Sequence, residues 1–186
     1  MPAKHVVLGV TGSIAAYKSV ELLRRLQDRG FDVSVVMTRS AAEFVTELTF
    51  RTLSRHPVGM DMFDPAAGWR PDHLALADRA DVFVVAPCTA NMLAKMAHGI
   101  ADDLLTCTAL SVTCPIVVAP AMNTKMWQHP ATQANVETLR KRGVVFAGVG
   151  TGRLACGVEG AGRMAEPGDI AGIVEKAVKA GRKGRK

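Results

Sequence analysis

The sequence lacks any apolar run near the roughly eighteen residues that a membrane-spanning helix needs. It shows no N-terminal signal peptide, and its four cysteines include no CxxC pair and no histidine at zinc-finger spacing. These absences argue against a membrane protein, a secreted disulfide scaffold and a zinc-binding module. We therefore expect a cytoplasmic protein with free thiols, no metal site and no membrane partner.

Two phosphate-binding signatures are also missing. Neither GxGxxG nor GxxxxGK[ST] occurs, and no acidic residue closes the second predicted strand, where a dinucleotide-binding protein would hold a ribose hydroxyl. Thr38, Arg39 and Ser40 stand at that strand end instead. The sequence thus argues against a dinucleotide site and against a P-loop.

Acidic residues are absent from the last eight residues, KAGRKGRK, which carry five of the 23 lysines and arginines. Removing those five charges from the net +6 leaves +1 for the rest of the chain. We expect one domain over residues 1–178 and a disordered basic tail over residues 179–186. Because the body is nearly neutral, we expect no nucleic-acid partner.

Strand-like and helix-like segments alternate along the chain. Strands are expected at residues 4–10, 32–37, 81–86, 116–119 and 144–147. Helices are expected at residues 14–29, 41–46, 48–54, 73–79, 92–97, 102–112, 132–142 and 169–180, with a turn-rich stretch at 56–71 and a glycine-rich loop at 149–168. This order predicts an α/β fold, a three-layer Rossmann-like (flavodoxin-like) parallel sheet with helices on both faces.

Two of the predicted strands end in the same way. VFVVAPCTAN (residues 82–91) and IVVAPAMNTKMW (residues 116–127) both pass from an apolar run through Ala-Pro into polar or sulfur-bearing side chains. In open α/β sheets ligands bind beyond the carboxyl ends of the strands, so we expect reactive groups at this rim. The alternative is that Met122, Met126 and Trp127 merely pack a loop.

Hydroxyl groups and glycine follow the first two strands. GVTGSIAAYK (residues 9–18) can form a tight turn at Gly12 and Ser13 whose N–H groups suit a phosphate. Thr38 and Ser40 bring hydroxyls to the neighbouring strand end. The serines have a second interpretation as helix caps. Together the two turns favour a phosphomonoester ligand, and a mononucleotide such as FMN has the right size.

Three residues are candidates for chemistry. His73 is either a group that titrates near neutrality or an ordinary surface or capping histidine. Asn123 offers an uncharged amide that can hold a carboxylate without a salt bridge, which suits a carboxylate that must leave as CO2. Cys156 lies in the glycine-rich loop, where a thiol is poorly placed for packing. The other cysteines, Cys88, Cys107 and Cys114, are expected to act as small apolar side chains.

Four motifs, in order, resemble those of the homo-oligomeric flavin-containing cysteine decarboxylases. PAMNTKMW (residues 120–127) matches their PxMNxxMW motif, and ACGVEGAGRM (residues 155–164) matches their substrate-clamp loop. APCTAN (residues 86–91) is similar to their PASAN flavin motif, with threonine keeping the hydroxyl of serine, and DHLALAD (residues 72–78) carries their histidine. The resemblance covers residues 4–178.

The resemblance implies FMN as cofactor and catalytic roles for His73, Asn123 and Cys156. It implies flavin contacts from residues at the strand ends, namely Gly12, Ser13, Ile14, Thr38, Ser40, Pro87, Thr89 and Asn91. It implies substrate contacts from the amide motif and the clamp, namely Met122, Asn123, Lys125, Met126, Ala155, Gly157, Arg163 and Met164.

The resemblance also implies a reaction, the decarboxylation of 4'-phosphopantothenoylcysteine to 4'-phosphopantetheine in coenzyme A biosynthesis. The substrate thiol is oxidised to a thioaldehyde at FMN, loss of CO2 gives an enethiolate, and Cys156 protonates it as the flavin is reoxidised. His73 would assist the oxidation or the cofactor geometry. Family members are homotrimers or homododecamers, and a phosphopantothenate-cysteine ligase domain can be fused or separate.

Three other functions stay open at this point. A lantibiotic-type peptidyl-cysteine decarboxylase resembles this chain but lacks the clamp cysteine. A flavin prenyltransferase-like protein shares the fold and FMN, although PxMNxxMW and the clamp argue against it. A non-catalytic regulatory relative would keep the fold without the clamp chemistry.

Overall fold

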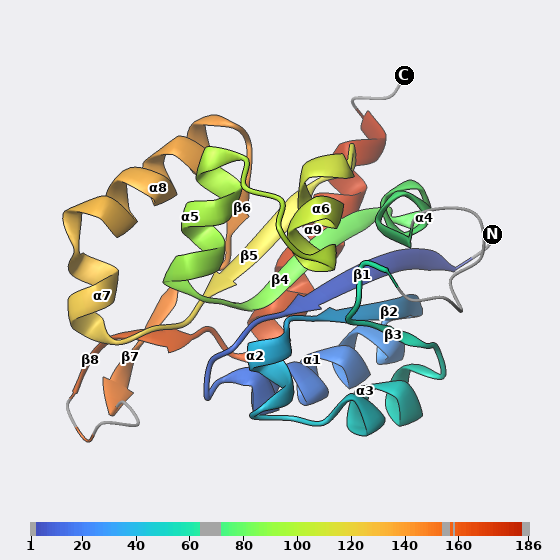
Figure 1. The fold of residues 1–186 in the computed structure, drawn as a ribbon, viewed down its shortest axis with the longest axis horizontal. Coiled ribbons are helices and arrows are strands. Elements are labelled where there is room, and N and C mark those ends of the chain that lie inside the picture. The colour runs from blue at the N-terminus through green and yellow to red at the C-terminus, as the bar shows by residue number, and fades with distance from the viewer. Residues whose placement is uncertain (1–2, 64–71, 154–156, 158, 184–186) are drawn as a thin grey trace.

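The computed structural model describes residues 3–63, 72–153, 157 and 159–183 (Figure 1). Within them, a six-stranded parallel sheet has the order β3-β2-β1-β4-β5-β6, so the order reverses between β1 and β4. This is the order of a Rossmann-like sheet. Its strands are β1 (Lys4–Val10), β2 (Phe31–Met37), β3 (Val58–Gly59), β4 (Val82–Cys88), β5 (Ile116–Pro120) and β6 (Val145–Phe146).

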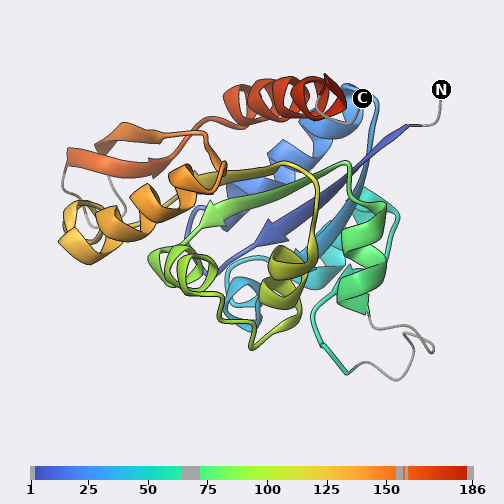
Figure 2. The same ribbon diagram turned by 90° about the horizontal axis from the view of Figure 1, so that it is seen from above.

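Helices cover both faces of the sheet, which confirms the predicted three-layer α/β fold (Figure 2). One face carries α1 (Ala16–Asp28), α3 (Glu47–Ser54) and α9 (Pro167–Lys183). The other carries α4 (Asp72–Arg79), α5 (Ala90–His98), α6 (Leu104–Ser111) and α8 (Pro130–Lys141). Two short helices, α2 (Arg39–Ala42) and α7 (Thr124–Gln128), follow the ends of β2 and β5. None of the helices in the described ranges is long and apolar enough to span a bilayer.

The core consists of two apolar clusters, one on each side of the sheet. Successive side chains of a strand point to opposite faces, so Val6 and Leu8 pack with α1 and α9 while Val7 packs with α5 and α6. Both sets are fully buried. Burial on both faces is the reason why these strands read as continuous apolar runs rather than as alternating patterns.

Residues 149–168 were expected to form a loop, but most of the described residues in this range form β-strands. β7 (Val149–Arg153) and β8 (Glu159–Met164) form an antiparallel hairpin. The sequence of β8 shows no apolar alternation, because glycines occupy the face of β8 that contacts the segment after β5. At Gly162, where φ is 139°, an added Cβ would collide with the carbonyl oxygen of Met122. The close approach therefore requires a residue without a side chain.

The chain end also differs from expectation. Helix α9 continues to Lys183, so residues 179–183 are helical rather than disordered. Ala177 and Val178 are still buried against the core, which holds this part of the helix in place. The Lys179 ammonium also pairs with Glu175 at 2.7 Å, one turn earlier.

A partly buried polar cluster lies at the amino ends of β1 and β2. His5 contacts Asp32 through Nδ1 and Ser34 through Nε2, both at 3.0 Å, and His56 Nε2 lies 2.6 Å from Asp32. Burial lowers the pKa of His5, and the nearby Arg79 guanidinium adds to this against the opposing effect of Asp32. Partial burial alone would raise the pKa of Asp32, but hydrogen bonds from His56 and His5 lower it.

We predict that this cluster makes the fold less stable in acid. The pKa of His5 lies below its ordinary value of 6.5, so the unfolded chain takes up the proton first. The stabilisation is complete above about pH 6.5 and is lost as the pH falls towards the folded-state pKa. Asp32, lowered from 3.8, adds a further loss at more acidic pH.

Denaturant unfolding at several pH values checks this prediction. His5→Gln is the matched variant, because glutamine can hydrogen bond to Ser34 but does not titrate. The advantage of the wild type over His5→Gln should shrink as the pH falls below about 6.5. A difference that stays constant with pH would contradict the assignment.

Candidate active site

A cavity of about 690 Å³ lies beyond the carboxyl ends of β1, β2, β4 and β5. This size is within the range of roughly 300–1,000 Å³ that is usual for small-molecule sites. The cavity spans the point where the strand order reverses, as expected for a doubly wound sheet. Its lining from the strand ends and the segments after them comprises Thr11, Gly12, Ser13, Thr38, Arg39, Ser40, Thr89, Ala90, Asn91, Met92, Ala121, Met122 and Met126.

Most of the residues expected to hold the flavin lie together in this lining. They are Gly12, Ser13, Thr38, Ser40, Thr89 and Asn91, and Met122 and Met126 from the expected substrate set join them. The other two do not line it. Ile14 is 57% exposed and lies beyond the turn, and the side chain of Pro87 is buried within β4.

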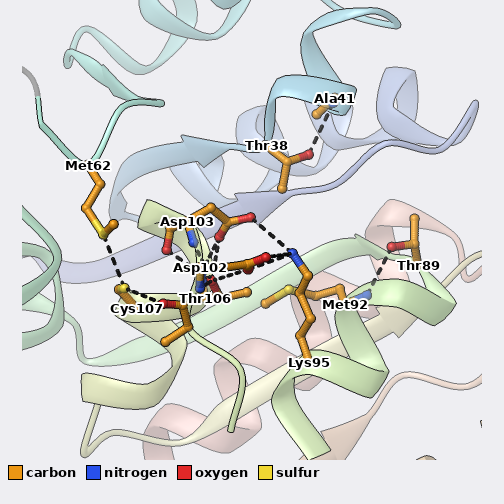
Figure 3. A network of polar contacts seen from close by, with 11 residues as sticks. Thr38, Ala41, Met62, Thr89, Met92, Lys95, Asp102, Asp103, Thr106 and Cys107 are labelled. Atoms are coloured by element: carbon orange, nitrogen blue, oxygen red, sulfur yellow. Dashed lines mark hydrogen bonds and ion pairs between the residues drawn. The ribbon is translucent and has the colours of Figure 1, made fainter. Parts of the chain in front are cut away.

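Threonines set the geometry of two strand exits. Thr38 caps α2 by accepting a hydrogen bond from the N–H of Ala41 at 3.2 Å (Figure 3). Thr89 caps α5 by accepting one from the N–H of Met92 at 3.3 Å. Ser13 accepts a hydrogen bond from the N–H of Ala15, also at 3.3 Å. The capping role considered for Ser40 therefore belongs to its neighbour Thr38.

Thr11 joins the exits of β1 and β4. Its hydroxyl donates to the carbonyl oxygen of Pro87 at 2.7 Å and accepts from the N–H of Thr89 at 3.2 Å. The peptide bond before Pro87 is cis, and the preceding carbonyl, of Ala86, accepts from the hydroxyl of Ser19 at 2.6 Å. The two bonds of Thr11 thus join β1 to β4 at the cavity, and the bond of Ser19 joins α1 to β4.

A second wall of the cavity has no motif in the sequence. It comes from the β3–α4 connection and the α5–α6 region, and consists of Met60, Asp61, Met62, Phe63, Lys95, Asp102, Asp103 and Leu104. Lys95 bonds both carboxylate oxygens of Asp102, at 2.7 and 2.9 Å (Figure 3). That hydrogen bond lowers the pKa of Asp102. Lys95 and Asp102 lie seven residues apart across the end of α5, so their pairing gave no signal in the sequence.

The same wall is tied to α6. Asp103 caps α6 by accepting from the N–H of Thr106 at 2.7 Å, and the side chain of Thr106 bonds back to form a capping box. The thiol of Cys107 contacts the sulfur of Met62 at 3.3 Å, which joins α6 to the β3–α4 connection (Figure 3). None of the described cysteines forms a disulfide, and burial raises the pKa of Cys88, as expected for a small apolar side chain.

Asn123 lies directly beside the cavity lining, at the start of α7. Its amide oxygen accepts from the N–H of Lys125 at 2.8 Å, so Asn123 is the N-cap of this helix. Met122 before it and Met126 after it line the cavity, but Asn123 and Lys125 do not. The bond to the helix fixes which end of the amide faces α7.

His73 is not brought to the cavity within one chain. It lies on α4, which packs against α6 on the side where β1 begins (Figure 1, Figure 2). The sequence placed the histidine ahead of β4 but carried no information on which side of the sheet its helix would lie.

The hairpin carries the expected clamp motif. The N–H of Met122 donates to the carbonyl oxygen of Gly162 at 2.9 Å, so β8 is bonded to the amide motif. Arg163 is partly exposed, whereas Met164 is 2% exposed and its side chain packs in the core, so the expected substrate contact of Met164 stays a prediction that its side chain does not support. Alternation along β8 turns Met164 inward. Gly157 does not line the cavity, and Ala155 and Cys156 lie outside the described residues.

Comparison with known proteins identifies the family. Residues 1–179 match the Flavoprotein family. The chain belongs to this family. It is similar to solved structures of a cysteine-to-serine mutant of PPC decarboxylase complexed with pantothenoylaminoethenethiol (TM-score 0.84, 35% identity, 94% of this chain and 97% of that chain) and of the FMN-dependent cysteine decarboxylase SpaF (TM-score 0.83, 33% identity, 97% and 98%).

Curated relatives of this flavoprotein are longer. The coenzyme A biosynthesis bifunctional protein CoaBC of Bacillus subtilis strain 168 is 46% identical over 173 residues, which are 93% of this chain and 43% of that protein. CoaBC of Escherichia coli K12 is 45% identical over 167 residues, 90% of this chain and 41% of that protein. The chain therefore spans less than half the length of these relatives.

The cavity fits a flavin mononucleotide. Gly12 allows the turns after β1 and β2 to touch, because an added Cβ would lie 2.5 Å from Cβ of Ser40. Those turns supply the hydroxyl and N–H groups that suit a phosphate. Met62 and Met122 supply apolar lining for flat rings. In the described part of the chain, no group of three or more His, Cys, Asp or Glu side chains is arranged to hold a metal ion.

We predict that Gly12→Ala weakens flavin binding by roughly tenfold or more, because its methyl group would push the two turns apart. Fluorescence titration of the apoprotein with FMN measures this. Gly172→Ala on α9 is the matched control, since nothing lies within 4 Å of the added Cβ. Equal affinities for the two variants would show that the contact between the turns does not shape the site.

Proposed function

We propose that this chain catalyses the FMN-dependent decarboxylation of 4'-phosphopantothenoylcysteine to 4'-phosphopantetheine, a step of coenzyme A biosynthesis, in the cytoplasm. One observation carries the proposal: six of the eight predicted flavin residues line one cavity whose edge is the PxMNxxMW segment, with the clamp hairpin bonded to that segment. The relatives named CoaBC and PPC decarboxylase support it.

Gly12, Ser13, Thr38 and Ser40 would hold the phosphate of FMN, and Thr89 and Asn91 its remaining polar groups. When bound, FMN supplies a two-electron sink for the substrate thiol, so that CO2 can leave without forming an unstabilised carbanion. Binding energy from the rest of the substrate would go into placing its cysteine end beside this cavity.

Asn123 would orient the substrate carboxylate. Its amide oxygen is directed to the N-terminus of α7 by the bond from Lys125, so the NH2 end of the amide is the donor suited to a carboxylate. Because the amide is neutral, it holds the carboxylate without the strong attraction that would oppose loss of CO2. Cys156, which lies in the clamp segment outside the described residues, would donate the final proton to the substrate carbon.

We further propose a homotrimer or homododecamer in which His73 reaches the cavity of a neighbouring copy. Two separate sets of exposed apolar side chains support a head-to-tail ring. Ile14 and Phe44 follow the turns that line the cavity, and Leu74 and Leu110 lie on α4 and α6, the helices near His73. The ligase activity of the bifunctional relatives would come from a fused or separate domain.

An assay on the FMN-loaded protein tests this function. We expect a yellow protein that releases CO2 from 4'-phosphopantothenoylcysteine without net oxidation. A peptide with a C-terminal cysteine serves as the competing substrate, because a peptidyl-cysteine decarboxylase would act on it. Release of CO2 only from the peptide, or no uptake of FMN, would refute the assignment.

We predict that Asn123→Asp abolishes turnover, with a loss of at least about 100-fold, because a carboxylate would face the carboxylate of the substrate. Aspartate caps a helix as well as asparagine does, so the fold should persist. The matched control is Asn135→Asp on α8, where the side chain contacts His98 away from the cavity. Steady-state CO2 release and circular dichroism report the two effects, and near wild-type rates in Asn123→Asp would remove the proposed role.

A further inference from the structure

A buried lysine of α1 holds the end of the hairpin. The side chain of Lys18 is only 10% exposed, and its Nζ lies 2.7 Å from Oε1 of Glu166 and 3.5 Å from the carbonyl oxygen of Met164. Lys18 is one turn after the Gly12–Ser13 turn of the cavity, and Glu166 directly precedes α9. The pair thus fixes the end of β8 against the helix that follows the flavin turn.

The same carboxylate oxygen faces a second cation. Arg163 Nη2 lies 4.0 Å from Oε1 of Glu166, so two positive charges share one negative charge. The hydrogen bond from Lys18 is the main reason why the pKa of Glu166 is lowered. The contact with Arg163 is long and partly solvated, with side chains 41% and 63% exposed. Such a contact contributes little to stability and leaves the arginine charge largely uncompensated.

The position of Arg163 allows its charge to bind an anion. It follows Gly162, whose carbonyl bonds to Met122 at the cavity edge. Its side chain runs along Gly152 of the paired strand, where an added Cβ would lie 2.9 Å from Nη1. An exposed guanidinium is therefore held on the hairpin one residue after the contact with Met122, on the opposite face of β8 from Gly162. A guanidinium is well suited to bind a phosphate or carboxylate through two N–H groups.

We propose that Lys18 is a positioning and specificity residue: it occupies Glu166, and Arg163 thereby keeps its charge for the phosphate of the substrate. This inference rests on the function proposed above. If Lys18 were absent, Glu166 would turn to Arg163 and neutralise it. The two anionic ends of the substrate can be told apart, because pantothenoylcysteine has the carboxylate but not the phosphate.

Lys18→Met removes the charge while filling the buried site with an unbranched apolar side chain. We expect this variant to raise KM for the phosphorylated substrate about two- to fivefold, with kcat and the KM for the unphosphorylated substrate nearly unchanged. Lys18→Arg, which keeps the charge, should stay close to the wild type. A loss that is equal for both substrates would show a merely structural role and overturn the proposal.

Double variants sharpen the test. Lys18→Met combined with Glu166→Gln should regain the low KM, because no carboxylate is left to pair with Arg163. In an Arg163→Met background, Lys18→Met should have no further effect on the preference for phosphate. Failure of either result would contradict the shared-carboxylate arrangement.

A binding measurement keeps this inference separate from the reaction. Calorimetric titration of the FMN-loaded protein with 4'-phosphopantetheine and with pantetheine needs no turnover. The affinity ratio of these two ligands should fall about two- to fivefold in Lys18→Met and recover in the double variant with Glu166→Gln. An unchanged ratio overturns the inference even if CO2 release proves the function, and a changed ratio supports it even if turnover is not detected.

Discussion

The hydroxyl of Thr11 makes the interaction on which the site depends. It donates to Pro87 and accepts from Thr89, so it joins the exits of β1 and β4 where the strand order reverses. Both bonds are buried or nearly so, and the groups they satisfy would be costly to leave unpaired. On one side of this joint the chain makes the Gly12 turn, and on the other it starts α5. Thr11 therefore extends the backbone pairing of β1 and β4 to the two strand exits that line the cavity.

The strand exits combine structural and binding roles. Thr38 and Thr89 cap helices with their side chains, which fixes the turns, while the same residues line the cavity. Asn123 caps α7 in the same manner. Capping orients a polar group at no further cost in conformational freedom once the helix has formed. Two caps in the cavity lining and one beside it therefore hold their polar groups in place without a ligand.

Much of the fold could be predicted from the sequence, because strands buried on both faces appear as unbroken apolar runs and helices as periodic ones. The Ala-Pro exits of β4 and β5 located the rim for the same reason. The hairpin was missed because Gly160 and Gly162 provide no apolar pattern on the face that contacts Met122 and Thr124. The segment at residues 60–63 was missed because it follows a strand of two residues and has no periodicity.

The parts of the site that could not be predicted depend on which elements meet in space. Motif neighbours such as Arg163 and Met164 are adjacent in the sequence, yet strand alternation sends one towards solvent and the other into the core. His73 shows the same limit on a larger scale, because the position of a helix in the sequence does not reveal at which end of the sheet its residues lie. The resemblance to a family indicates which residues belong to the site, but only the packed structure shows where their side chains point.

Charged side chains are unevenly distributed around the cavity. Lys95 is shared by Asp102 and Asp103, and Asp61 lies on the same wall, so this wall has three carboxylates and one cation. On the opposite side, Arg39 lies among the hydroxyl groups of the turns, and no ion pair to it is found among the described residues. A ligand with a phosphate is attracted to the turns and repelled from the α6 wall, since charges of one sign focus in a low-dielectric cleft. This distribution of charge favours a mononucleotide bound with its phosphate at the turns and its rings towards the α6 wall.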